Sequence, residues 1–149
     1  MELIDTPYKL VSRFMILGFG IPFTLVGIII YVNLNHNWSL LFNGVLWLAI
    51  GFSFMGYDVH NKKKLIRLKE SMTISEGTDV KIIPALGIKI GSYVTARVEC
   101  HIYSDGVYKT VKSGFFLLSP HDTVERLKVV VYMGNLSKNQ IAFEVYRLV

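Results

Sequence analysis

Charged side chains are absent from a long stretch of this chain. Residues 14–57 contain no Asp, Glu, Lys or Arg, and only 18% of the 149 residues are charged, against roughly 25% in a typical soluble domain. Hydrophobic residues make up 52% of the sequence and the mean hydropathy is +0.42. This composition excludes intrinsic disorder and an ordinary soluble enzyme of this length, and it predicts a membrane protein.

Cysteine is almost missing as well. The single Cys100 excludes an intrachain disulfide and a cysteine-rich zinc site. The histidines are isolated along the chain, and Cys100 and His101, as neighbours on a predicted strand, point to opposite faces. We therefore expect no bound metal and no other cofactor.

The residue types of a hydrolytic triad occur once, at Ser119, His121 and Asp122. They crowd a single predicted turn, where a line from hydroxyl to imidazole to carboxylate is hard to build, and no glycines for an oxyanion hole adjoin them. The apolar stretch contains no acidic or basic side chain that a proton relay would need. The sequence thus predicts no catalytic residue and a protein that is not an enzyme.

The apolar stretch divides at a polar cluster, residues 33–37, into segments 14–32 and 38–57. Each has about 20 residues, which as a helix spans about 30 Å, the thickness of a bilayer core. A short linker returns the chain to the same side, so we predict an α-helical hairpin of two transmembrane helices. The predicted organisation is an N-terminal cytoplasmic segment at 1–13, the transmembrane hairpin at 14–58, a basic juxtamembrane segment at 59–70 and a cytoplasmic β domain at 71–149.

Small residues recur on one face of each predicted span and are candidates for helix–helix packing. The candidates are Gly20, Thr24 and Gly27 in the first span and Gly44 and Gly51 in the second. The general abundance of glycine in membrane helices is an alternative explanation for them. Pro22 is expected to kink the first helix or to interrupt its hydrogen bonds.

A basic run follows the second span immediately, and the linker between the spans has no basic residue. The run consists of Lys62, Lys63, Lys64, Arg67 and Lys69. By the positive-inside rule it places both termini in the cytoplasm, with the protein in an inner or plasma membrane. Its second expected role is contact with anionic lipid headgroups, at about 1 kcal/mol per residue. Nucleic acid is not an expected partner, because the run lies against the bilayer and no recognition helix follows it.

The second half of the chain changes to a period of two. From 93 to 103, apolar and polar residues alternate, as in a strand with one buried face. Asp105 and Gly106 then predict a hairpin turn. The pattern to the C-terminus predicts an all-β domain of five to seven mainly antiparallel strands, a small barrel or sandwich, with Val94, Val98 and Ile102 in its core.

The order of a hairpin anchor, a strand, an Asp-Gly turn, a second strand and a valine-rich strand resembles a bacterial family of two-span membrane proteins of unknown function with a C-terminal β domain. Members of that family end this domain in a segment like Val-Tyr-Tyr-Asp-Pro-x-Asn-Pro. Here residues 129–136 read Val-Val-Val-Tyr-Met-Gly-Asn-Leu, without the Asp-Pro and Asn-Pro pairs. The resemblance covers about half of the chain. It implies the same architecture and brings no catalytic residues.

The functional hypothesis is a non-enzymatic, membrane-anchored protein-interaction module, a subunit or regulator of a membrane complex. One alternative is a bacterial immunity or exclusion protein that acts at the membrane. A second is a β barrel that binds a lipid or another ligand. The expected partners are membrane lipids and a partner protein or further copies of this chain.

Overall fold

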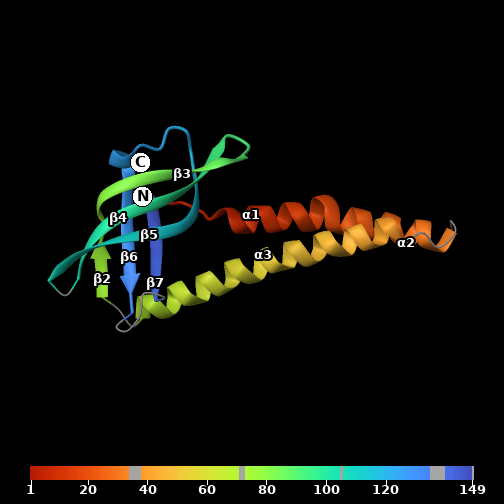
Figure 1. Ribbon diagram of the computed structural model, residues 1–149, viewed down its shortest axis with the longest axis horizontal. Helices are drawn as coiled ribbons and strands as arrows, with labels where there is room; N and C mark the ends of the chain where they lie inside the picture. Colours follow the sequence, from red (N-terminus) through yellow and green to blue (C-terminus); the bar gives the residue numbers. More distant parts are fainter. Residues whose placement is uncertain (34–37, 71–72, 105, 135–139, 149) are drawn as a thin grey trace. The chain divides into compact units, whose positions relative to one another are not determined.

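The computed structural model describes residues 1–33, 38–70, 73–104, 106–134 and 140–148. Residues 34–37 of the linker predicted at 33–37 lie outside this part of the chain, and so do Asp105 of the predicted hairpin turn and Asn135. Two long apolar helices are followed by an antiparallel β domain, which confirms the fold predicted from the sequence at this level (Figure 1). The chain forms two compact units, Tyr8–His60 and the combination of Met1–Pro7 with Asn61–Val149.

The first apolar helix covers Pro7–Asn33 and changes character along its length. It consists of α1 (Pro7–Arg13), a π-helical segment η1 (Phe14–Gly20) and α2 (Ile21–Asn33). At the junction, the Ile21 N–H donates to the carbonyl of Ile16, five residues back. The next residue is Pro22, which has no N–H and whose ring crowds the preceding turn. The proline therefore accounts for the wider, π-helical hydrogen bonding directly before it.

The second apolar helix, α3, runs over Ser39–Glu70. It is longer than the predicted span 38–57, because the basic run continues the helix and does not end it. Lys, Arg and Glu are all good helix formers. Both helices are long and apolar enough to cross a membrane, judged by length and composition.

The β domain contains two antiparallel sheets. The first has the strand order β1-β7-β6-β2 and the second the order β3-β4-β5 (Figure 1). The short helix η2 (Val124–Arg126) precedes β6. The strands are β1 (Glu2–Leu3), β2 (Thr73–Glu76), β3 (Thr78–Ile90), β4 (Tyr93–Ser104), β5 (Val107–Leu118), β6 (Leu127–Met133) and β7 (Ile141–Arg147).

The core lies between the two sheets. Val98, Ile102 and Val131 are fully buried there, together with Cys100 and Val145. Val94, predicted as a core residue, is half-buried. Gly77 joins the sheets where β2 leads into β3, and its N–H donates to the Val129 carbonyl at 3.0 Å.

The four-stranded sheet is buried on parts of both faces. Along β6 and β7, Val131 and Val145 face the core, so Tyr132 and Glu144 face the other way. Both of these outer residues are nevertheless buried, and Lys69 in the last turn of α3 reaches them. The outer face of β6 is thus partly covered, with Tyr132 buried and Val130 half-buried.

The N-terminal segment is part of the β domain. β1 pairs with the end of β7, with Glu2 opposite Arg147. Next to it, the Ile4 N–H donates to the Val145 carbonyl at 2.9 Å, and the Leu117 N–H of β5 donates to the Asp5 carbonyl at 3.0 Å. The segment therefore joins β7 of one sheet to β5, the edge strand of the other. No local pattern in residues 1–13 predicts a strand there.

Candidate functional sites: the helix contact and two polar clusters

The two apolar helices approach each other most closely at glycines. A Cβ added at Gly27 would lie 2.6 Å from the Cα of Leu41, and one added at Gly44 would collide with the backbone of Thr24. Real Cβ atoms do not approach backbone that closely, so no larger residue fits without separating the helices. The Thr24 hydroxyl donates to the Gly20 carbonyl at 2.7 Å within its own helix.

The other glycines of the predicted stripes lie at the same contact. Added Cβ atoms would meet the Leu48 side chain from Gly20 and the Ile16 side chain from Gly51. The structure thus brings all five small residues singled out in the sequence to one helix–helix interface, where close backbone approach strengthens van der Waals packing.

The opposite surfaces of these helices are apolar and exposed. Only 11% of each apolar window is buried. More than half of the surface of many large side chains is free: Phe14, Leu17, Leu25, Ile29, Val32, Phe42, Val45 and Phe52. A core helix of a soluble protein would have most of this surface covered.

The basic run occupies the last turns of α3 and divides into two kinds of side chain. Lys62, Lys63 and Arg67 are exposed and Lys64 is half-buried. The ammonium of Lys69 instead lies 2.5 Å from the Glu144 carboxylate and 5.6 Å from the centre of the Tyr132 ring. The last basic residue of the run therefore pairs with a buried carboxylate of the β domain, although its own side chain is 42% exposed.

The Glu144 carboxylate is the centre of the first polar cluster. The side chain is 4% exposed, and its second oxygen accepts hydrogen bonds from the hydroxyls of Tyr132 at 2.7 Å and Tyr146 at 2.8 Å. With Lys69 on the first oxygen, both carboxylate oxygens have partners. A buried charge is tolerable only when it is paired and hydrogen-bonded in this way.

This environment shifts the pKa values of the cluster. Burial acts to raise the pKa of Glu144, but the hydrogen bonds from Lys69, Tyr132 and Tyr146 outweigh it and hold that pKa below its usual value. Burial, reinforced by the hydrogen bond to the anionic Glu144, raises the pKa of Tyr132 to about 12. The cluster is therefore in one ionisation state, an anionic Glu144 with neutral tyrosines, through the physiological range.

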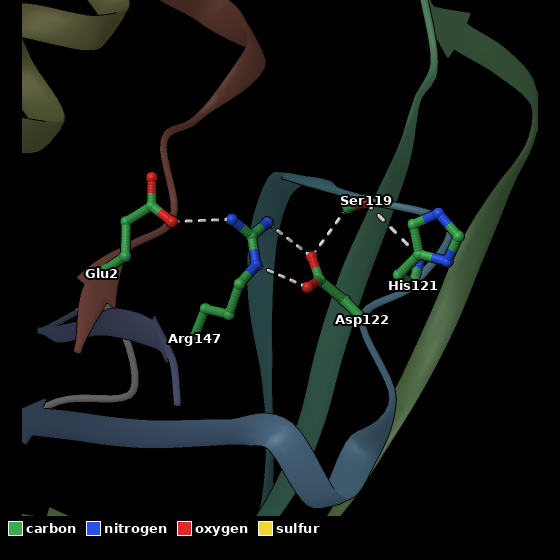
Figure 2. A network of polar contacts seen from close by, with 5 residues as sticks. All are labelled: Glu2, Ser119, His121, Asp122 and Arg147. Atoms are coloured by element: carbon green, nitrogen blue, oxygen red, sulfur yellow. Dashed lines mark hydrogen bonds and ion pairs between the residues drawn. The ribbon is translucent and has the colours of Figure 1, made fainter. Parts of the chain in front are cut away.

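The second polar cluster joins both ends of the chain to a loop, as Figure 2 shows. The Arg147 guanidinium donates to both oxygens of Asp122, at 2.6 and 2.7 Å, and to Glu2 at 2.9 Å. The Ser119 N–H donates to the same Asp122 carboxylate at 2.7 Å. The hydrogen bonds from Arg147 hold the pKa of Asp122 below its usual value.

The triad residue types lie in this loop, but they are not arranged as a triad. The Asp122 carboxylate is occupied by Arg147, and the His121 ring points away from it (Figure 2). His121 is linked to Ser119 through its backbone N–H, at 3.4 Å from the hydroxyl oxygen. The carboxylate, imidazole and hydroxyl therefore form no relay in this geometry.

Sequence reasoning singled out Lys69 and Asp122 for other roles and missed their partners in these clusters, Glu144, Arg147 and Glu2. Glu144 had a readable signal, since it stands alone among apolar residues in a predicted strand. Arg147 and Glu2 had none, because their contact joins opposite ends of the chain. Within the described residues, no group of three His, Cys, Asp or Glu side chains is placed to hold a metal ion.

Comparison with known proteins adds no relative: no protein-family model, curated protein or solved structure matches this chain.

Proposed function

We propose that this chain is a membrane-anchored protein-interaction module and not an enzyme: a helical hairpin inserted in the bilayer holds a β domain at its cytoplasmic surface. The observation that carries the proposal is the helical unit itself. Its two helices contact each other through glycines and expose large apolar side chains on their remaining surface. Lipid is the solvent in which such a surface is stable.

The N-terminal strand supports a same-side arrangement of the two ends of the chain. Met1–Pro7 belongs to the same compact unit as Asn61–Val149, and both apolar helices lie between them in the sequence. A chain that leaves this unit through one span must return to it through the other. The basic run after the second span then places the unit in the cytoplasm, because membranes retain Lys and Arg on that side.

The topology is testable with single cysteines in a Cys100→Ser background. We expect Asn33→Cys, at the far end of α2, to react with a membrane-impermeant thiol reagent on intact cells. Lys112→Cys, exposed in the β domain, should react only after the cells are opened. The reverse pattern would overturn the orientation, and equal labelling of both positions in intact cells would overturn membrane insertion.

The basic run is expected to determine this orientation. Replacing Lys62, Lys63 and Lys64 together with Gln should produce a mixture of orientations, because only Arg67 and Lys69 remain beside the second span. Arg67→Gln alone is the matched control and should keep a single orientation, since three lysines still flank the span. The same cysteine labelling measures both. An unchanged pattern in the triple variant would mean that another feature orients the hairpin.

The interaction part of the proposal is supported by the end of the β4–β5 hairpin. Tyr103 and Tyr108 pack edge to face with ring centres 5.0 Å apart and remain 60% and 70% exposed. Tyrosine is enriched where proteins bind one another.

A photo-crosslinking residue placed at Tyr108 in living cells tests whether this hairpin binds a partner, and one placed at Lys81 on β3 is the control. Capture of a stoichiometric membrane partner from Tyr108 only would support the proposal. Capture of a secreted toxin would favour an immunity protein. Capture at neither position would contradict a partner at this hairpin.

A further inference from the structure

The β domain is incomplete without its N-terminal segment. Ile4 is 5% exposed and belongs to the core cluster of the domain. Its N–H and the Asp5 carbonyl bond to Val145 of β7 and Leu117 of β5, strands of different sheets; β5 is an edge strand, and β7 has only β1 on its outer side. Removal of the segment would open the core at Ile4 and leave these two backbone groups of β7 and β5 without their present partners.

A second contact holds the outer end of the segment. Arg147 donates to Glu2 while it also binds Asp122 through two hydrogen bonds (Figure 2). Since Asp122 already fixes the guanidinium, Glu2 meets a donor that is oriented in advance. Within five residues, the segment is thus attached by the buried side chain of Ile4, by backbone hydrogen bonds and by an ion pair.

The path of the chain gives this attachment a consequence. In the sequence, the helical unit lies between the N-terminal segment and the rest of the β domain. The segment can therefore pair with the domain only when the two helices bring both to the same side of the membrane. We infer that residues 1–5 act as a clasp that makes closure of the β domain conditional on correct insertion of both spans. The inference rests on the proposed membrane anchoring and adds to it a coupling between insertion and folding.

The physical basis is distance. When only one of the two spans crosses the bilayer, the segment and the β domain lie on opposite sides of about 30 Å of hydrocarbon. No strand pairing is then available to the segment, and the domain keeps an open edge between β5 and β7. An open edge and an unfilled core lower the free energy needed for local unfolding.

The reactivity of the Cys100 thiol measures whether the core of the β domain is closed. This thiol is fully buried in the core beside Gly77, and burial, followed by the nearby charge of Glu99, raises its pKa to about 11. It therefore reacts with a thiol reagent only when the core opens. Its labelling rate with a membrane-permeant reagent in native membranes reports closure of the domain. Insertion is measured separately, by resistance to alkaline extraction.

Four variants, each of which keeps the complete β-domain sequence 61–149, are compared with the wild-type chain. The first lacks residues 2–5. The second carries the same deletion and a C-terminal graft, Asn-Gly-Glu-Leu-Ile-Asp after Val149, which returns the strand antiparallel to β7. The third lacks residues 14–33, so that its single span leaves an intact segment outside the cell, verified by protease removal of an N-terminal tag. The fourth adds the graft to the third.

We expect Cys100 to be labelled at least about tenfold faster in the first and third designs, and at close to the wild-type rate in the two grafted chains. Wild-type labelling in the first or third design would overturn the clasp, and so would fast labelling in both grafted chains. Extraction of the wild-type chain at alkaline pH would instead contradict the membrane anchor, whatever the labelling rates. The two failures are therefore distinguishable.

Discussion

We expect Val98→Asp to unfold the β domain, whereas Arg97→Asp, at the neighbouring position, should leave it folded. Val98 is fully buried opposite Ile82, in the centre of the core. A carboxylate there has no partner, and an unpaired buried charge costs several kcal/mol, a large part of the stability of a domain of this size.

Arg97 is the matched control because it lies on the opposite face of the same strand. Its guanidinium is exposed and stacks on the Phe115 ring at 4.3 Å from the centroid. Loss of this contact is expected to cost about 0.5–1 kcal/mol. Thermal unfolding of the full chain in detergent measures both variants. Equal damage would mean that the outer face of the three-stranded sheet is also covered, by lipid or by a partner.

The parts of the fold that could be predicted are those with a local signal. A charge-free stretch marks the two helices, because two runs of about 20 apolar residues are long enough to predict long apolar helices. Strict alternation around Val98 and Cys100 marks β4, because one face of that strand is buried. The alternation was not a complete guide to burial: Thr95, on the predicted polar face, is 3% exposed.

The parts that were missed depend on contacts distant in sequence. β1 is two residues long, and its partner Arg147 lies at the other end of the chain. Nothing in a pentapeptide distinguishes such a strand from a disordered terminus. The segment around Pro84, where a proline would be expected to end a strand, is one continuous strand, β3, with shifts in its register against β4.

The candidate sites show the same division. Glycine spacing is a local pattern, and all the glycines it singled out lie at the helix contact. The basic run could also be recognised in the sequence, but the contact that its last residue makes could not. Lys69 looks identical to its neighbours in sequence, and only the approach of β7 makes it a partner of Glu144. Which lysine faces solvent and which is engaged is decided by tertiary structure.

Removal of the Glu144 carboxylate should be the most damaging change outside the apolar core. Glu144→Ala leaves the hydroxyls of Tyr132 and Tyr146 without their acceptor and Lys69 without its counterion. Lys69 is 42% exposed and can be rehydrated, so the loss comes mainly from the hydroxyl of the buried Tyr132, with a smaller part from the half-buried Tyr146. We expect a decrease of about 2–3 kcal/mol in the free energy of unfolding, measured by denaturant titration in detergent.

Glu76→Ala is the control, because its ion pair with Lys128 lies on the same sheet but is exposed. Such a pair is worth about 0–1 kcal/mol, so a loss as large as that of Glu144→Ala would show that burial of the cluster is not what matters.

Acid should remove the Glu144 contribution in a defined direction. Because the pKa of Glu144 is lower in the folded chain than its usual value, its stabilising effect is complete above about pH 4.3, the ordinary pKa of glutamate. The effect is lost as the pH falls through the lower, folded-state value, where both states bind the proton. The difference in stability between the wild-type chain and Glu144→Gln should therefore be constant near neutral pH and shrink in acid. A difference that grows as the pH falls would mean that Glu144 is already protonated in the folded protein, and that Lys69 is not its counterion.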